Sequence, residues 1–78
     1  MMLTFEFKKS LKSGIGDELE IHADIEGLRS LISQLRLLEE HKTDHIHLMS
    51  ESWGGSHLAD QPQDEANRVV HHVKIALR

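Results

Sequence analysis

Apolar and polar residues alternate along four stretches of the chain, and a period of two predicts half-buried strands. The alternation is clearest at the start, where single polar residues separate Leu3, Phe5 and Phe7. The same pattern predicts further strands over residues 18–22, 44–49 and 67–77. Between the first two strands, the glycines, serines and lysines of residues 9–17 predict a loop or hairpin turn.

After the second predicted strand, apolar residues are spaced by three and four positions, as on one face of a helix. Asp24 suits the N-cap, and Glu26 suits the positive end of the helix dipole. The pattern predicts a helix over residues 24–41. The helix residues that we expect in the core are Leu28, Leu31, Ile32, Leu35 and Leu38. Their expected partners on the strands are Phe5, Phe7, Leu19, Ile21, Ile46, Leu48, Val69 and Val73.

The order strand, strand, helix, strand, strand predicts an α+β fold of the ββαββ type. In this fold one helix covers one face of a four-stranded, mainly antiparallel sheet, and the other face stays open. If the third strand pairs with the first, the spatial order is 2-1-3-4. With 78 residues, the chain is expected to form one domain over residues 1–78.

The amino-acid composition indicates the cellular location and the class of partner that we expect for this protein. The chain contains no cysteine, no long apolar run and no apolar leader at its start, so we expect a cytoplasmic protein that does not enter the membrane. The net charge of −4 argues against nucleic acid and favours a basic partner. The chain lacks the glycine-rich nucleotide motifs and the serine elbow of hydrolases, so we expect neither a cofactor nor an enzyme.

Histidines suggest an alternative chemistry. His45 and His47 are predicted to lie on one strand face, about 7 Å apart. His22 and His72 could share that open face, and imidazoles are common zinc ligands. No spacing matches a dedicated metal motif, so a solvated sheet face is the simpler interpretation. A metal site using these four histidines stays open as an alternative.

The stretch from Ser50 to Asp64 follows neither period, and it contains the chain's only tryptophan, Trp53. Gly54 and Gly55 follow Trp53 directly. Long loops in small domains are often functional, and tryptophan often anchors interfaces. We expect the Trp53 ring to rest on the edge of the core, with the glycines turning the chain so that residues 56–60 project.

The run 44-DHIHLMSESWGGSHLAD-60 resembles immunity protein family 32, as do the ββαββ length and the C-terminal VVHHVKI strand. That family is predicted to neutralise bacterial polymorphic toxins and has an α+β fold with a characteristic tryptophan, which the resemblance assigns to Trp53. It implies a small bacterial protein that binds and occludes a toxin. The loop residues that we expect to contact the toxin are Glu51, Trp53, His57 and Asp60. A homodimer through the open sheet face or an edge strand is a further alternative.

Overall fold

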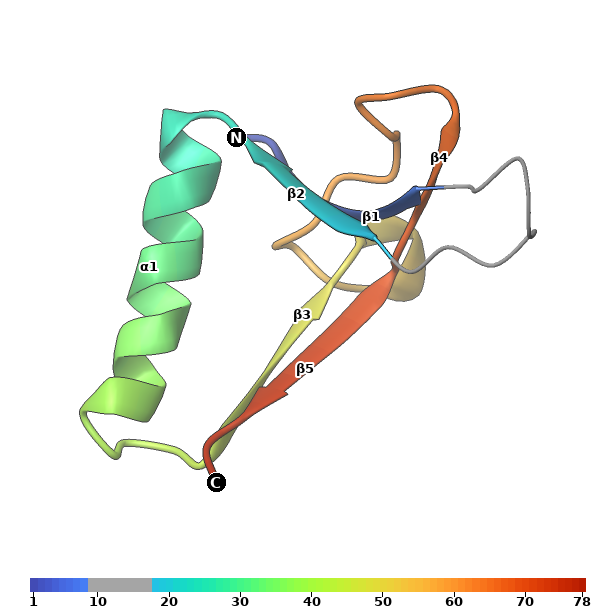
Figure 1. Cartoon of the computed structure of the whole chain (residues 1–78). Helices are drawn as coiled ribbons and strands as arrows, with labels where there is room; N and C mark the ends of the chain where they lie inside the picture. The colour runs from blue at the N-terminus through green and yellow to red at the C-terminus, as the bar shows by residue number, and fades with distance from the viewer. Residues whose placement is uncertain (9–17) are drawn as a thin grey trace.

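The computed structural model describes residues 1–8 and 18–78, and the turn predicted over residues 9–17 lies outside the described residues. Within these residues the fold is α+β, with one α-helix and five strands in two antiparallel sheets (Figure 1). The predicted fold class is therefore confirmed. The elements in chain order are β1 (Leu3–Lys8), β2 (Leu19–Ala23), α1 (Ile25–Glu39), β3 (His45–Met49), the 3-10 helix η1 (Glu51–Trp53), β4 (Asn67–Val69) and β5 (His72–Ala76).

The predicted single sheet with the order 2-1-3-4 is wrong. The larger sheet has the order β2-β1-β4, and β3 pairs with β5 in a second, two-stranded sheet. The cause is a bend that divides the predicted last strand. The Val70 amide donates to the Phe5 carbonyl, at 2.8 Å, whereas the His71 carbonyl accepts from the Ser50 amide, at 2.9 Å. The backbones of the successive residues Val70 and His71 thus form hydrogen bonds to different sheets.

The same bend changes which valines face the core. Val69 lies opposite Glu6 in the β1–β4 register, on the face of the larger sheet that carries polar side chains. Val70 packs against the core cluster instead. The prediction that Val69 is a core residue is therefore wrong, and the prediction for Val73, which lies opposite the buried Leu48, is correct.

Helix α1 starts as the sequence predicts and docks closely on the N-terminal segment. The Asp24 carboxylate accepts a hydrogen bond from the Gly27 amide at 2.7 Å, which confirms Asp24 as the N-cap. The Asp24 amide donates to the Met2 carbonyl at 3.0 Å. Gly27 lies so close to Met2 that a Cβ atom there would come within 1.9 Å of the Met2 carbonyl oxygen. Within the described ranges, the structure contains no helix with the length and apolar character needed to cross a membrane.

The core is smaller than the sequence predicts. Its buried centre consists of Leu3, Phe5, Leu48 and Leu58, against which Leu31, Val70, Val73 and Ile75 pack. Leu38 and Ile46 are also buried. However, Leu28, Ile32 and Leu35 on α1, and Phe7, Leu19 and Ile21 on the larger sheet, are exposed by 39–52%. These six were predicted as core residues, and that prediction is wrong.

The arrangement of the elements explains this exposure. Figure 1 shows that α1 stands beside the two sheets instead of lying across the middle of one. Leu31 and Leu38 are seven residues apart and share one line along the helix, so both reach the core. Leu28, Ile32 and Leu35 are rotated from that line. Only one side of the apolar stripe therefore meets the sheets.

A buried carboxylate fastens the long loop to the other face of the larger sheet. Glu6 is fully buried and accepts hydrogen bonds from the Thr4 hydroxyl, the Gln63 amide (2.9 Å) and the Asn67 side chain (3.1 Å). Burial alone would raise the pKa of Glu6, but these bonds, with one from the Asp64 amide, lower it to about 2. Glu6 is therefore charged at neutral pH and holds residues 63–67 in place.

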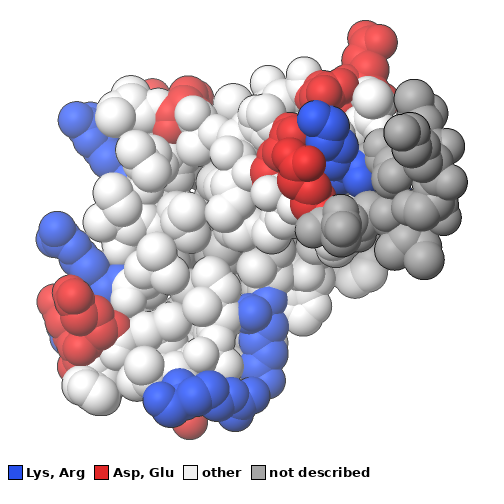
Figure 2. Space-filling view, viewed as in Figure 1, with Lys and Arg blue, Asp and Glu red and all other residues white. Residues whose placement is uncertain are grey.

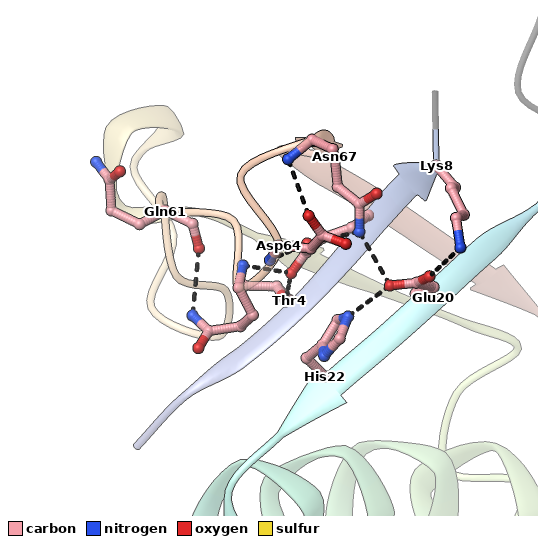
Figure 3. A network of polar contacts seen from close by, with 10 residues as sticks. Thr4, Lys8, Glu20, His22, Gln61, Asp64 and Asn67 are labelled. Atoms are coloured by element: carbon pink, nitrogen blue, oxygen red, sulfur yellow. Dashed lines mark hydrogen bonds and ion pairs between the residues drawn. The ribbon is translucent and has the colours of Figure 1, made fainter. Parts of the chain in front are cut away.

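Asn67 extends this network across the sheet, as Figure 3 shows. Its side-chain nitrogen also donates to Glu20 on β2, at 3.0 Å. The same Glu20 carboxylate pairs with His22, at 2.8 Å, and with Lys8, at 3.8 Å. The polar face of the larger sheet is thus joined to β4 and the loop by a continuous set of hydrogen bonds and ion pairs.

Candidate partner-binding surface

The turn after β3 is built from backbone hydrogen bonds that need both glycines. The Ser50 carbonyl accepts from the Trp53 amide at 3.0 Å and from the Gly55 amide at 2.8 Å. Gly54 has a φ of 85°, in the left-handed region that favours glycine. A Cβ atom on Gly55 would come within 2.2 Å of the Met49 carbonyl oxygen. The expectation that this turn depends on glycine is confirmed, but the expectation that residues 56–60 project is wrong, because Leu58 is buried in the core.

Trp53 ends η1 with its ring outside the core. The side chain is 55% exposed, so the expectation that it rests on the core edge is wrong. The indole instead stacks on the imidazole of His71, with centroids 5.5 Å apart and an angle of 7° between the planes. His71 comes from the bend between β4 and β5, so this bend provides the support that we expected from the core.

A polar network holds His71 in this orientation. The Ser50 hydroxyl lies 2.8 Å from His71 Nδ1, and an Asp60 carboxylate oxygen lies 3.7 Å from the same nitrogen. The Ser52 hydroxyl donates to Asp60 at 2.7 Å, and this bond is the main cause of the lowered pKa of Asp60. The serines and the aspartate share one imidazole nitrogen. A catalytic triad places them on opposite nitrogens, so this geometry does not form one.

An open pocket of about 570 Å³ lies beside the Trp53 ring. Its walls combine two exposed aromatic side chains, Trp53 and Phe7, with the cationic Arg68. Val69, Val70, His71 and His72 complete the lining. An apolar group with a polar or negatively charged end would find matching chemistry here.

The predicted contact residues divide between the two sides of the loop. Glu51, His57 and Asp60 line a separate depression of about 340 Å³, which does not include Trp53. The structure thus brings three of the four predicted residues together and places Trp53 with another set. Sequence analysis missed Phe7 and Arg68 as neighbours of Trp53. The alternation along β1 predicted Phe7 as a core residue, and no sequence pattern links residue 68 to residue 53.

Three of the four candidate metal-binding histidines meet on the outer face of the smaller sheet. His47 Nδ1 lies 2.8 Å from His72 Nε2, and the His45 ring lies edge-on to His47 with centroids 5.1 Å apart. His22 belongs to the Glu20 network of the larger sheet instead. In residues 1–8 and 18–78, no group of three or more histidine or acidic side chains has the arrangement needed to hold a metal ion.

The electrostatics of this histidine face oppose protonation at its centre. Partial burial lowers the pKa of His47, and the nearby His45, His72 and Lys74 lower it further. Protonation of His47 is therefore disfavoured at its contact with His72.

Comparison with known proteins agrees with the resemblance of the Trp53 stretch. The model of the immunity protein 32 family matches residues 18–73, a span that includes α1, both strands of the smaller sheet up to Val73, and the whole turn around Trp53. No curated protein and no solved structure matches the chain. The family match covers well over half of the 78 residues, and the chain therefore belongs to the immunity protein 32 family.

Proposed function

We propose that this protein binds a bacterial polymorphic toxin in the cytoplasm and neutralises it by occluding its active surface. Family membership supports an immunity function. The observation that carries the proposal is the exposed, well-supported Trp53 beside Phe7. The chain has one tryptophan, two phenylalanines and no tyrosine, and two of these three aromatic side chains are about half exposed around one pocket.

Such an arrangement suits a binding anchor. Tryptophan is enriched among the residues that dominate interface energies, and an anchor that is already held in place loses little entropy on binding. The His71 stack provides this support before any partner arrives. Arg68 adds a cationic group to the Trp53 pocket, and Glu51, His57 and Asp60 line the separate depression on the other side of the loop. The net charge of −4 would speed encounter with a basic toxin.

The test mixes this protein with its cognate toxin and measures both the inhibition of the toxin and the dissociation constant of the complex. Trp53→Ala should raise the Kd at least 30-fold, the loss that corresponds to about 2 kcal/mol at an interface anchor. Ile25→Ala is the matched control, because Ile25 is an equally exposed apolar residue on α1. A Trp53→Ala protein that neutralises the toxin as well as the wild type would contradict the proposal.

A metal-binding function is the second candidate, and the contact between His47 and His72 favours it. Two imidazoles are an incomplete ligand set for zinc, which usually has three or four protein ligands. Calorimetry with zinc at neutral pH provides the test. Micromolar or tighter binding that disappears in a His47→Ala/His72→Ala double variant would support this function, and weak binding that the double variant retains would exclude it.

A further inference from the structure

Toxin binding through the Trp53 loop leaves an apolar surface between α1 and β2 without a role. We call it the α1–β2 apolar face, and it consists of Leu19, Ile21, Leu28, Ile32 and Leu35. Figure 2 shows uncharged atoms across the surface from α1 to the strands, with most charged side chains around its margin. These five half-exposed side chains leave on the order of 400 Å² of apolar surface in water, an area that marks an interaction site in many proteins.

This face adjoins a free strand edge. In the larger sheet β2 is the outer strand, and among the described residues it pairs only with β1. An unpaired edge offers a row of backbone amides and carbonyls to another strand. Leu19 and Ile21 stand on β2 itself, so a strand added at this edge would also extend the apolar face.

We propose that a second copy of this chain covers this face, through antiparallel pairing of β2 with β2 of the second copy about a two-fold axis at Ile21. In this register Ile21 meets Ile21 of the second copy, and Leu19 lies opposite Ala23. Glu20 lies opposite His22, and the symmetry repeats this pair. A carboxylate and an imidazole in facing positions can hydrogen-bond across a pair of strands, and the apolar side chains gather on one face.

Neighbouring registers that keep the apolar residues on one face are less favourable. An axis at Glu20 would bring the two Glu20 carboxylates together, and like charges directly opposite each other destabilise a strand pair. An axis at His22 would place the two imidazoles together and Glu20 opposite Asp24. The register centred on Ile21 is the one of these three in which all five residues of β2, Leu19–Ala23, find a partner, and its like-charged pair, Glu18 with Asp24, lies outside the strand.

The symmetry of this pairing also accounts for the exposed helix residues. A two-fold axis that relates antiparallel strands of one sheet runs perpendicular to the sheet, so both copies of α1 lie on the same face. The two larger sheets become one continuous sheet, with the order β4-β1-β2 followed by its symmetry mate. The exposed stripes of the two helices then flank a joined layer of Leu19 and Ile21 side chains.

A second copy fits better than the toxin as the occupant, an argument that rests on the proposed function. An immunity protein must stay folded and dispersed before any toxin arrives, so an apolar face of this size needs a partner that is always present. A second copy is always present. The α1–β2 face of the second copy is also apolar, with its charged side chains at the margin, so the two faces match each other.

The oligomeric state of the full chain provides the test, measured by light scattering and sedimentation over a range of concentrations without toxin. We expect a particle of twice 8.9 kDa. Ile21→Lys places two ammonium groups at the axis and should raise the dimer dissociation constant at least 100-fold. Ser33→Lys is the matched control, because it adds the same charge at an exposed position on the opposite side of α1 and should leave the dimer intact.

A charge exchange tests the register. His22→Glu places a second carboxylate opposite Glu20 and should weaken the dimer at least 10-fold, and adding Glu20→His should restore it. Circular dichroism shows whether each variant is folded. A folded wild type that stays monomeric at every concentration, or a dimer that Ile21→Lys leaves unchanged, overturns the proposal. A monomer whose toxin binding is lost in Ile21→Lys assigns the face to the toxin and also overturns it. Because dimerisation is measured without toxin, its failure is distinct from failure of the proposed function.

Discussion

The indole of Trp53 lies parallel to the imidazole of His71, with an angle of 7° between the two planes. This contact joins the turn after β3 to the bend between β4 and β5, two segments that are far apart in the sequence. The bend exists because Val70 bonds to one sheet and His71 to the other. The orientation of the proposed toxin anchor therefore depends on how the two sheets divide the last strand.

The fluorescence of Trp53 should report its position directly, because it is the only tryptophan. We expect a solvent-like emission in the isolated protein, since more than half of the side chain is exposed. The emission should shift to shorter wavelength when the toxin binds. Trp53→Ala should change the free energy of unfolding by no more than about 1 kcal/mol, because little core packing is lost. A blue emission in the isolated protein would contradict the exposed position.

Glu6 should make the fold sensitive to acid. Its pKa is about 2 in the folded state and 4.5 for an ordinary glutamate. A carboxyl group whose pKa is lowered by folding stabilises the protein above its unfolded pKa, and this contribution is lost as the pH falls through the folded pKa. We expect the free energy of unfolding, measured with urea, to decline from about pH 4.5 towards pH 2.

Substitution separates Glu6 from the other carboxyl groups. Glu6→Gln should lower the stability at neutral pH by about 1–3 kcal/mol, because a charged acceptor for buried donors is lost. It should also flatten the decline between pH 4.5 and 2. Glu65→Gln, at an exposed loop position, is the control and should leave the profile unchanged. An equally steep decline in Glu6→Gln would assign the acid sensitivity to other groups.

For Gly27→Ala, helix propensity and side-chain packing predict opposite effects on the stability of the protein. Propensity alone makes alanine more favourable than glycine in a helix by about 1 kcal/mol. The contact with the Met2 carbonyl leaves no room for a methyl group, so we expect Gly27→Ala to destabilise the protein by about 2 kcal/mol. Thermal unfolding provides the measurement. Ser33→Ala, at an exposed position on the same helix, should be neutral or slightly stabilising.

Gly54 and Gly55 should respond differently to alanine. Gly54 has open space around it and only a positive φ, so alanine should cost about 1 kcal/mol there. Gly54→Asn should recover part of this loss, because asparagine tolerates the left-handed conformation. Gly55→Ala should cost more, since its methyl group would meet the Met49 carbonyl. Chemical denaturation of the three variants checks this order, and equal losses for both alanine variants would contradict it.

Substitutions of Leu38 and Leu35 test which side of the apolar stripe of α1 packs into the core. Leu38 is 6% exposed, so Leu38→Ala should cost about 2–5 kcal/mol. Leu35 is 39% exposed, and the same change there should cost much less in the monomer. Unfolding experiments at low protein concentration make the comparison. If the two variants lose the same stability, α1 packs through its whole apolar stripe, as the sequence first suggested.

The local elements of this protein could be predicted from its sequence, and their assembly could not. The spacing of apolar residues and the helix N-cap located β1, β2, α1 and β3, because these patterns depend on residues that are close in the sequence. The bend at Val70 and His71 has no local sequence pattern, since both segments beside it are rich in strand-forming residues. An apolar stripe also shows that a helix can bury a face, but not how much of that face this chain buries.

For the candidate site, too, the sequence predicted the local structure but not the neighbours that other elements provide. The turn around Gly54 and Gly55 follows from local backbone chemistry, and its position was correct. The neighbours of Trp53 come from β1 and from the bend, so they depend on the arrangement of the sheets. Phe7 was misplaced for the same reason, because its alternation fits a buried position and an exposed apolar position equally well.

The division of the last strand also sets the order in which this protein can fold during its synthesis. Glu6 pairs with Val69, and Leu48 pairs with Val73, so both sheets stay incomplete until residues 67–76 are made. The long-range pairing of β1 with β4 gives a high contact order, which slows folding. Until then the nascent chain carries β1 and β3 without β4 and β5. A chaperone that covers these strands during translation would therefore increase the yield of folded protein.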